Sequence, residues 1–312
     1  MIRYFWSLVC WYLRPLIKWF LHRTTQMCEL QRICYGKVSG AARTLEVEKS
    51  LRQSRNLDIR SMVERLDEMA NNRQINIKTE RAVLEEAIRT VLLAKKINPL
   101  AHPDFAKSFG KCVELIWGYR QLVVECEDLR KCCYNSDDSE HETALLKLWN
   151  LLKPHESLES RVTKQWQDIG FQGDDPKTDF RGMGVLGLEN LVFFAQEYPA
   201  AASRSLSHSS HPSYGYAFAI VGINLTSMAL RLLRDGAAKT HIYNTSKTLP
   251  TVRAFHQLYS YLFYEFDAFW IDSKPTSMME FSSIQEKFET SVRTALANPS
   301  TVFRINVLIE SV

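Results

Sequence analysis

Apolar residues recur at helical spacing through most of this chain, and residues that interrupt helices are scarce. The segment 79–96 carries four apolar residues on one helical face, at i, i+4, i+8 and i+11: Val83, Ala87, Val91 and Ala94. The 312 residues include only 12 glycines and 10 prolines, too few for the turns of an all-β protein. With 46% hydrophobic residues the chain can bury a sizeable core. These patterns predict an all-α fold.

Other segments show the same helical pattern. They are 109–133, the run ALLKLWNLL before Pro154, 214–234 before Gly236, and 253–270. The acidic run at 135–142 is expected to be a loop, and Ser139 with Glu142 matches a capping box for the helix after it. Segment 253–270 places six side chains on one face, typical of a core helix: Phe255, Leu258, Tyr259, Leu262, Phe263 and Phe266.

Charge is unevenly distributed along the chain. Residues 1–60 carry 11 Lys and Arg against 4 Asp and Glu, and the whole chain has a net charge of +4, so the remainder carries −3. A basic N-terminal arm on a mildly acidic body suits an anionic membrane surface. Because the body offers no continuing basic groove, we expect no nucleic-acid partner.

The cysteine and histidine patterns predict neither a disulfide framework nor a metal site. The seven cysteines are odd in number, absent from the last 179 residues and without paired CxxC steps, so a reducing cytosol is expected. His208 and His211 lack further ligands, and we expect a solvated loop over the Ser-rich segment 203–213. No metal and no cofactor are expected.

The first 22 residues, MIRYFWSLVCWYLRPLIKWFLH, combine many aromatic side chains with a narrow basic stripe. On a helical wheel the basic residues fall within about 100° and the rest is largely apolar. This pattern is typical of a helix that lies in the bilayer interface. The predicted membrane contacts are Arg3, Trp6, Trp11, Arg14, Lys18 and Trp19. A membrane span and a helix packed on the protein body remain open as alternatives, although Arg14 and Lys18 disfavour a span.

The segment 166–191, WQDIGFQGDDPKTDFRGMGVLGLENL, holds five of the twelve glycines. Such density predicts a loop whose backbone adopts special conformations or approaches another molecule closely. Arg181 stands between Phe180, a possible anchor, and Gly182. A guanidinium on such a loop suits phosphate oxygens, because it is always charged and presents a planar fork of donors. A buried arginine that holds the loop together is the alternative.

Gly182, Gly184 and Gly187 match the dinucleotide fingerprint GxGxxG by spacing. That motif needs a preceding β-strand and an acidic residue about 20 positions later. A polar DDPKTD run precedes the glycines here, and no βαβ alternation follows. We therefore expect no nucleotide-binding site. The chain also lacks GxxxxGK[ST], so we expect that it does not hydrolyse GTP itself.

The same segment closely resembles the signature of the ELMO domain. The pattern W-x3-G-F-Q-x3-P-x-T-D-F-R-G-x-G-x-L-G-L-x2-L is met at every fixed position. The resemblance extends to CELQRIC at 28–34, to the YNSDDSEHE loop with LLKLWNLL, and to HPSYGYAFAIVGINLT. The resemblance covers most of the chain. The chain is similar to the short proteins that consist of an N-terminal extension and one ELMO domain.

This resemblance implies a helical bundle-like ELMO domain at 135–305. A helical region at 28–134 and a membrane-associating helix at 1–27 would precede it. The implied function is GTPase activation toward GTP-bound Arf and Arf-like GTPases, with Arg181 as an arginine finger in trans. The protein would be an activator rather than an enzyme. The residues expected to shape the loop or to contact the partner are Trp166, Gly170, Phe171, Gln172, Pro176, Thr178, Asp179, Phe180, Gly182 and Gly184.

Within that set, Gln172 is a candidate second finger by analogy, and Thr178 and Asp179 are expected to fix the loop through hydrogen bonds to the backbone. Two other functions stay open: a non-catalytic, membrane-tethered adaptor, and an organiser of membrane contacts or lipid droplets. The expected localisation is cytoplasmic and membrane-associated, at the endoplasmic reticulum, the mitochondrial surface or lipid droplets. The partner GTPase and the oligomeric state do not follow from the sequence.

Overall fold

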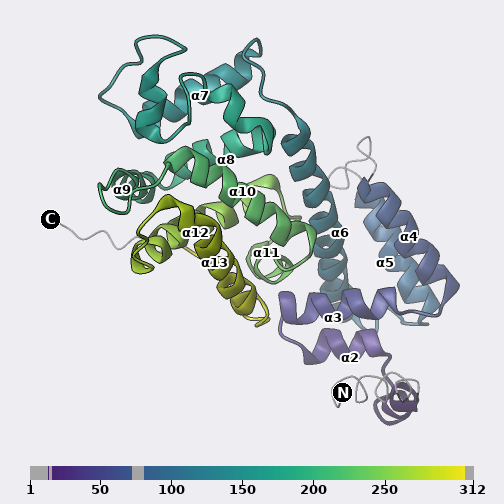
Figure 1. The fold of residues 1–312 in the computed structure, drawn as a ribbon. Helices are drawn as coiled ribbons and strands as arrows, with labels where there is room; N and C mark the ends of the chain where they lie inside the picture. The colour runs from purple at the N-terminus through teal and green to yellow at the C-terminus, as the bar shows by residue number, and fades with distance from the viewer. Residues whose placement is uncertain (1–12, 14–15, 72–80, 306–312) are drawn as a thin grey trace. The chain divides into compact units, whose positions relative to one another are not determined.

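The computed structural model describes residues 13, 16–71 and 81–305 of the chain (Figure 1). Every regular element within those ranges is a helix and none is a strand, which confirms the predicted all-α class. The chain forms two compact units, residues 1–118 and 119–312. Helix α6 (Pro103–Lys131) contributes residues to both of them.

The first unit is a series of helices in which neighbours along the chain pack together. A helix over 16–25 comes first, and it is followed by α2 (Glu29–Gly36), α3 (Ala41–Arg52), α4 (Leu57–Asn71), α5 (Arg81–Ala94) and the first part of α6. Contacts join α2 to α3, α3 to α4, and α4 to α5. On α4 the apolar residues Ile59, Met62, Val63 and Leu66 recur at i, i+3, i+4 and i+7 and are buried.

Helix α8 (Gly184–Glu197) lies at the centre of the second unit. It contacts α7 (Ser139–Leu152), α9 (Pro199–Ser209), α10 (Phe218–Arg234) and α12 (Val252–Asp272). Most of its circumference is buried, as expected for a helix enclosed by others. The short α11 (Lys239–Thr245) and the C-terminal α13 (Phe281–Leu296) contact α12.

The periodic segments correspond to helices whose ends differ from the predicted ones. Segments 79–96, 109–133 and 253–270 match α5, α6 and α12, and the six core residues predicted on α12 have no exposed surface. Helix α10 begins at Phe218, four residues later than expected. The residues before it form a loop that returns to α9, because the Tyr216 N–H donates to the carbonyl of Ser209 at 2.9 Å.

The cap of α7 differs from the predicted capping box. Asp138 precedes the helix, and its carboxylate accepts the backbone N–H groups of Glu140 and His141 at 2.9 and 3.4 Å. The side chain of Glu142, expected to complete a box with Ser139, instead accepts hydrogen bonds from Tyr134 and Arg161. The predicted box is therefore wrong: an aspartate one position earlier caps the helix and also favours its positive end.

Candidate functional site

The glycine-rich segment folds as two short 3-10 turns between α7 and α8. The first is η1 (Lys164–Ile169) and the second is η2 (Pro176–Arg181). Thr163 caps η1 by accepting the N–H of Gln165, and Asp175 caps η2 by accepting the N–H of Lys177. Pro176 opens η2, a position where a missing N–H costs nothing. Each turn is thus held at its start by a local hydrogen bond.

A chain of aromatic rings fixes both turns to the body of the second unit. Trp149 of α7 contacts Trp166, which contacts Phe171, and Phe171 contacts Phe180, with ring centroids 5.5, 5.8 and 5.6 Å apart. Tyr134 completes the chain, 5.3 Å from Phe180. Trp166, Phe171 and Phe180 are at most 3% exposed. Among the predicted site residues, these three therefore shape the loop from inside.

Arg161 is a residue of this site that the sequence did not single out. Its guanidinium donates to Glu142 at 2.5 Å, to Asp175 at 3.2 Å and to the hydroxyl of Tyr134 at 3.2 Å. Burial alone would raise the pKa of Glu142, but the hydrogen bonds from Arg161 and Tyr134 outweigh it and lower that pKa. The half-buried Arg161 thus holds α7, the segment before α7 and the cap of η2 together.

Arg181 has the opposite surroundings. It ends η2 directly after the buried Phe180, its side chain is exposed, and it makes no hydrogen bond or ion pair with any residue that the structure describes. Gly182 follows, and no atom outside its chain neighbours lies within 4 Å of the position that a Cβ would take there. The guanidinium of Arg181 is therefore carried on an anchored turn and is available to another molecule.

The polar residues near Arg181 differ in whether their side chains make hydrogen bonds with the described residues. The carboxylate of Asp179 accepts the backbone N–H of Gln172 at 2.9 Å, which links η2 to the preceding loop as expected for Asp179. The hydroxyl of Thr178 makes no hydrogen bond with a described residue, so its expected role in fixing the loop has no support here. The side chain of Gln172 is exposed.

Two glycines close the ends of the segment against other helices. Gly170 has φ +83, and a Cβ there would lie 2.2 Å from the backbone nitrogen of Phe218 at the start of α10. Gly184 has φ +53, and a Cβ there would lie 2.4 Å from the carbonyl oxygens of Arg130 and Cys132. The backbone N–H of the next residue, Val185, donates to the Cys132 carbonyl at 2.9 Å. No other residue type fits either position without displacing backbone.

Comparison with known proteins identifies the family of this site. The statistical model of the ELMO/CED-12 family matches residues 124–285, which include η1, η2 and α8. This chain belongs to the ELMO/CED-12 family. The matched range 124–285 overlaps the expected ELMO domain at 135–305 and lies inside the compact unit 119–312. The three ranges have different ends, and the predicted domain bounds stay a prediction.

Relatives resemble the chain over nearly its full length. ELMO domain-containing protein 1 of Bos taurus is 43% identical, over 93% of this chain and 90% of the relative. ELMO domain-containing protein 2 is 45% identical in Bos taurus, over 89% of each chain, and 42% identical in Homo sapiens, over 93% of this chain and 94% of the relative. The similarity therefore includes the first unit as well as the ELMO domain.

The GxGxxG spacing within the ELMO domain has a structural explanation. Gly184 and Gly187 lie in the first turn of α8, preceded by the 3-10 turn η2 rather than by a strand. The would-be Cβ of Gly187 lies 3.2 Å from the Cβ of Met183, so a small residue suits the packing there. The described residues offer no βαβ unit for a dinucleotide.

The prediction of a solvated loop at 203–213 is wrong for its first part. Helix α9 continues to Ser209, and His208 on it bonds the buried carboxylate of Asp267 in α12 at 2.8 Å. Tyr216 donates to the same carboxylate at 2.7 Å, so Asp267 joins three elements. His211 stacks on Tyr214. Within the described residues, no group of three or more His, Cys, Asp or Glu could hold a metal ion.

Of the six predicted membrane residues, Arg3, Trp6, Trp11 and Arg14 lie outside the described residues. Trp19 is 67% exposed on the helix over 16–25. Lys18 forms an ion pair with Glu29 of α2 at 2.5 Å, so this side chain packs on the first unit. No helix in the described part of the chain has both the length and the apolarity to cross a membrane.

Proposed function

We propose that this protein activates GTP hydrolysis by Arf or Arf-like GTPases, and that Arg181 acts in trans as the arginine finger. The supporting observation is the contrast between the two arginines of the site. Arg161 fills the structural role that an arginine in such a loop often has, and the exposed Arg181 has no intramolecular partner among the described residues. A side chain kept unpaired beside a buried anchor suits insertion into another protein's nucleotide site.

The proposed chemistry belongs to the partner's bound GTP. Water attacks the γ-phosphorus, the bond from that phosphorus to the β–γ bridging oxygen breaks, and the electron pair of this bond stays on GDP. Negative charge grows on the bridging oxygen and is spread over the γ-phosphoryl oxygens. Two N–H groups of Arg181 donate to these atoms and stabilise the transition state more than the bound GTP. Fingers of this kind accelerate hydrolysis by about 10³–10⁵.

Single-turnover GTP hydrolysis tests this proposal. Purified Arf and Arf-like GTPases loaded with GTP are mixed with the wild-type protein, with Arg181→Ala, or with Arg204→Ala. Arg204 is a matched control, because it is also exposed and unpaired in the described second unit but lies on α9. We expect stimulation by the wild type and by Arg204→Ala only. Binding of a GTPase without stimulation would instead support the adaptor function.

We also propose that the protein works on the cytoplasmic surface of a membrane. The helix over 16–25 leaves Leu16 65%, Trp19 67% and Phe20 59% exposed. Apolar and aromatic side chains on a short basic helix suit the bilayer interface. Such a location brings the activator to GTPases that are themselves bound to membranes.

A further inference from the structure

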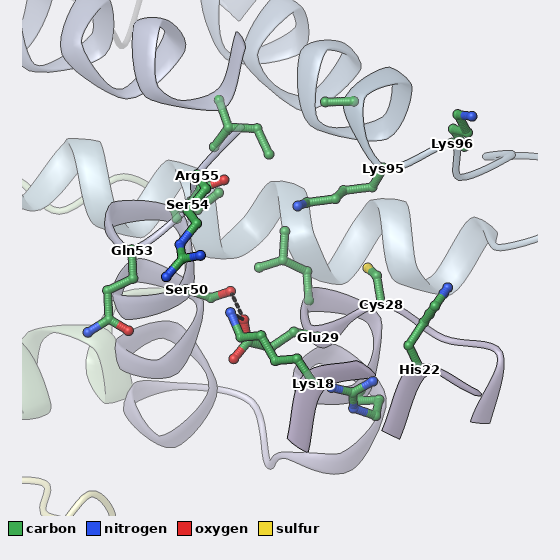
Figure 2. Close-up of a pocket in the computed structure, with 15 residues that line it drawn as sticks. Lys18, His22, Cys28, Glu29, Ser50, Gln53, Ser54, Arg55, Lys95 and Lys96 are labelled. Atoms are coloured by element: carbon green, nitrogen blue, oxygen red, sulfur yellow. Dashed lines mark hydrogen bonds and ion pairs between the residues drawn. The ribbon is translucent and has the colours of Figure 1, made fainter. Parts of the chain in front are cut away.

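The first unit contains a cavity of about 680 Å³ that the proposed GTPase activation does not use (Figure 2). It is lined by the helix over 16–25, by α2, by the end of α3 with the connection to α4, and by the residues at the end of α5. Its volume is typical of a site for a small molecule or a headgroup. All its lining residues fall between 18 and 96, within one compact unit.

The lining of this cavity is strongly basic. Its cationic residues are Lys18, Arg32, Arg55, Lys95 and Lys96. One carboxylate, Glu29, lines it, and that group is paired with Lys18. Arg55, Lys95 and Lys96 form no ion pair with a described residue. Because Glu29 offsets Lys18, the cationic groups of this lining without an ionic partner outnumber its free carboxylates, and such a lining concentrates anions.

The basic side chains converge. Figure 2 shows Lys18, Arg55 and Lys95 directed toward a common space above Glu29 and Ser50, whereas Lys96 points away from it. The Ser50 hydroxyl donates to Glu29 at 2.8 Å. Lys95 is half buried and Arg55 is exposed, so one cation lies deeper than the other. Glu29 offsets the charge of Lys18, so Arg55 and Lys95 leave a net charge of about +2 around this space, which suits an anion of more than one charge such as a phosphomonoester.

The same cavity has an apolar part. Leu30, Leu51 and Ile59 line it and are at most 2% exposed. The helix over 16–25 supplies Lys18 and His22 to the cavity and exposes Leu16, Trp19 and Phe20 to solvent. One helix thus joins a cationic enclosure to a surface suited to the bilayer interface. This combination favours an amphiphilic anion that reaches the cavity from a membrane.

We propose that the cavity binds the phosphomonoester headgroup of an anionic phospholipid. Arg55 and Lys95 bond the phosphate oxygens, and the exposed Leu16, Trp19 and Phe20 of the helix over 16–25 contact the apolar part of the bilayer next to the headgroup. The proposal rests on the proposed membrane association and is independent of GTPase activation. Recognition of the headgroup would select one membrane, which exposed apolar side chains alone cannot do.

Vesicle co-sedimentation tests this proposal with a matched pair of variants. Phosphatidylcholine vesicles carry either phosphatidylinositol 4-phosphate or phosphatidylserine at equal total charge. The cavity variant is Arg55→Gln with Lys95→Gln. The control is Arg60→Gln with Lys107→Gln, which removes the same charge from two exposed residues of the first unit outside the cavity. Circular dichroism melts compare the folding of all three proteins.

We expect the wild type and the control to bind the phosphoinositide vesicles at least about tenfold more tightly than the phosphatidylserine vesicles, and the cavity variant to lose this preference. A wild type without the preference, or an equal loss in both variants, would overturn headgroup recognition and leave membrane association intact. No binding to any vesicle would overturn both proposals. Soluble inositol 1,4-bisphosphate that binds as tightly as the vesicles would assign the cavity to a free anion and overturn the lipid source.

Discussion

Two arginines twenty positions apart illustrate how this site assigns different roles to one residue type. Arg161 meets two carboxylates and a phenol hydroxyl in a half-buried setting, and burial of these groups makes its bonds stronger than they would be in water. The side chain of Arg181 is exposed to solvent and bonds none of the described residues. Stability should therefore depend on Arg161, and recognition of another molecule on Arg181.

Replacing the two arginines in turn separates these roles. Arg161→Met leaves Glu142 and Asp175 without their cation, and we expect it to lower the free energy of unfolding by about 2–3 kcal/mol. Arg181→Met should change it by less than about 0.5 kcal/mol, because no described contact is lost. Urea denaturation measures both. An equal loss in the two variants would show that Arg181 is structural.

Two glycines of the segment should also differ. Gly184→Ala forces a side chain into a φ of +53 and against two carbonyl oxygens 2.4 Å away, so we expect a loss of more than about 2 kcal/mol. Gly182→Ala meets open space at a helical φ of −82 and should leave the unfolding free energy nearly unchanged. If a GTPase approaches this face closely, Gly182→Ala will still lower the stimulation of GTP hydrolysis. Stimulation equal to wild type would argue against a close approach there.

At the scale of elements, helix α11 holds the C-terminal segment through a buried histidine. Nδ1 of His241 accepts the backbone N–H of Phe303 at 3.1 Å, and burial lowers the pKa of His241 to about 4. Burial also lowers the pKa of His256 in α12 to about 4. Between about pH 6.5 and 4 the unfolded chain therefore binds more protons at these residues than the folded chain.

Stability should consequently fall as the pH is lowered from about 6.5 toward 4, by up to about 1.4 kcal/mol per pH unit for each histidine. Urea denaturation at pH 7, 6 and 5 measures this slope. His241→Gln keeps an acceptor without a titrating group and should reduce the slope. The same change at His256, whose pKa burial also lowers, should reduce the slope as well. A slope unaffected by His241→Gln would contradict the assignment.

The helix over 16–25 is the element that we expect to enter the bilayer interface. Trp19→Ala removes its largest exposed ring and should weaken co-sedimentation with anionic vesicles several-fold. Leu100→Ala is the control, because Leu100 is 90% exposed in the first unit but lies outside this helix. Equal effects of the two substitutions would indicate non-specific adsorption.

Elements with long periodic patterns were predictable, whereas short or long-range features were not. Helices α5, α6 and α12 repeat their apolar positions over several turns. The 3-10 turns η1 and η2 are too short for a periodic signal. Helix α9 was missed because serine favours loops, yet Ala201, Ala202 and Leu206 bury its inner face.

The candidate site was predictable to a similar extent. Glycine density and the resemblance to the ELMO signature pointed to Arg181, and Phe180 beside it was a possible anchor for the loop. Arg161 could not be found this way, because its partners Glu142, Asp175 and Tyr134 lie 19, 14 and 27 positions from it. No local pattern specifies pairs at such separations.

At the scale of the whole molecule, the two proposed activities belong to different compact units. The ELMO signature and Arg181 lie in residues 119–312, and the basic cavity and the helix over 16–25 lie in residues 1–118. We expect substitutions in one unit to abolish one activity and to leave the other unchanged. Arg55→Gln with Lys95→Gln should keep full stimulation of GTP hydrolysis without vesicles, and Arg181→Lys should keep vesicle binding. Loss of both activities in either protein would contradict this separation.

The central claim is that Arg181 acts on the partner's transition state. Its most direct test is the single-turnover rate of GTP hydrolysis by a responsive Arf-family GTPase at saturating wild-type protein or Arg181→Lys, with the affinity of each protein for the GTP-bound partner measured alongside. Lysine keeps the charge but lacks the planar fork. We predict similar affinity and a loss of about 10³ or more in the acceleration. Full acceleration by the folded lysine variant would contradict the account.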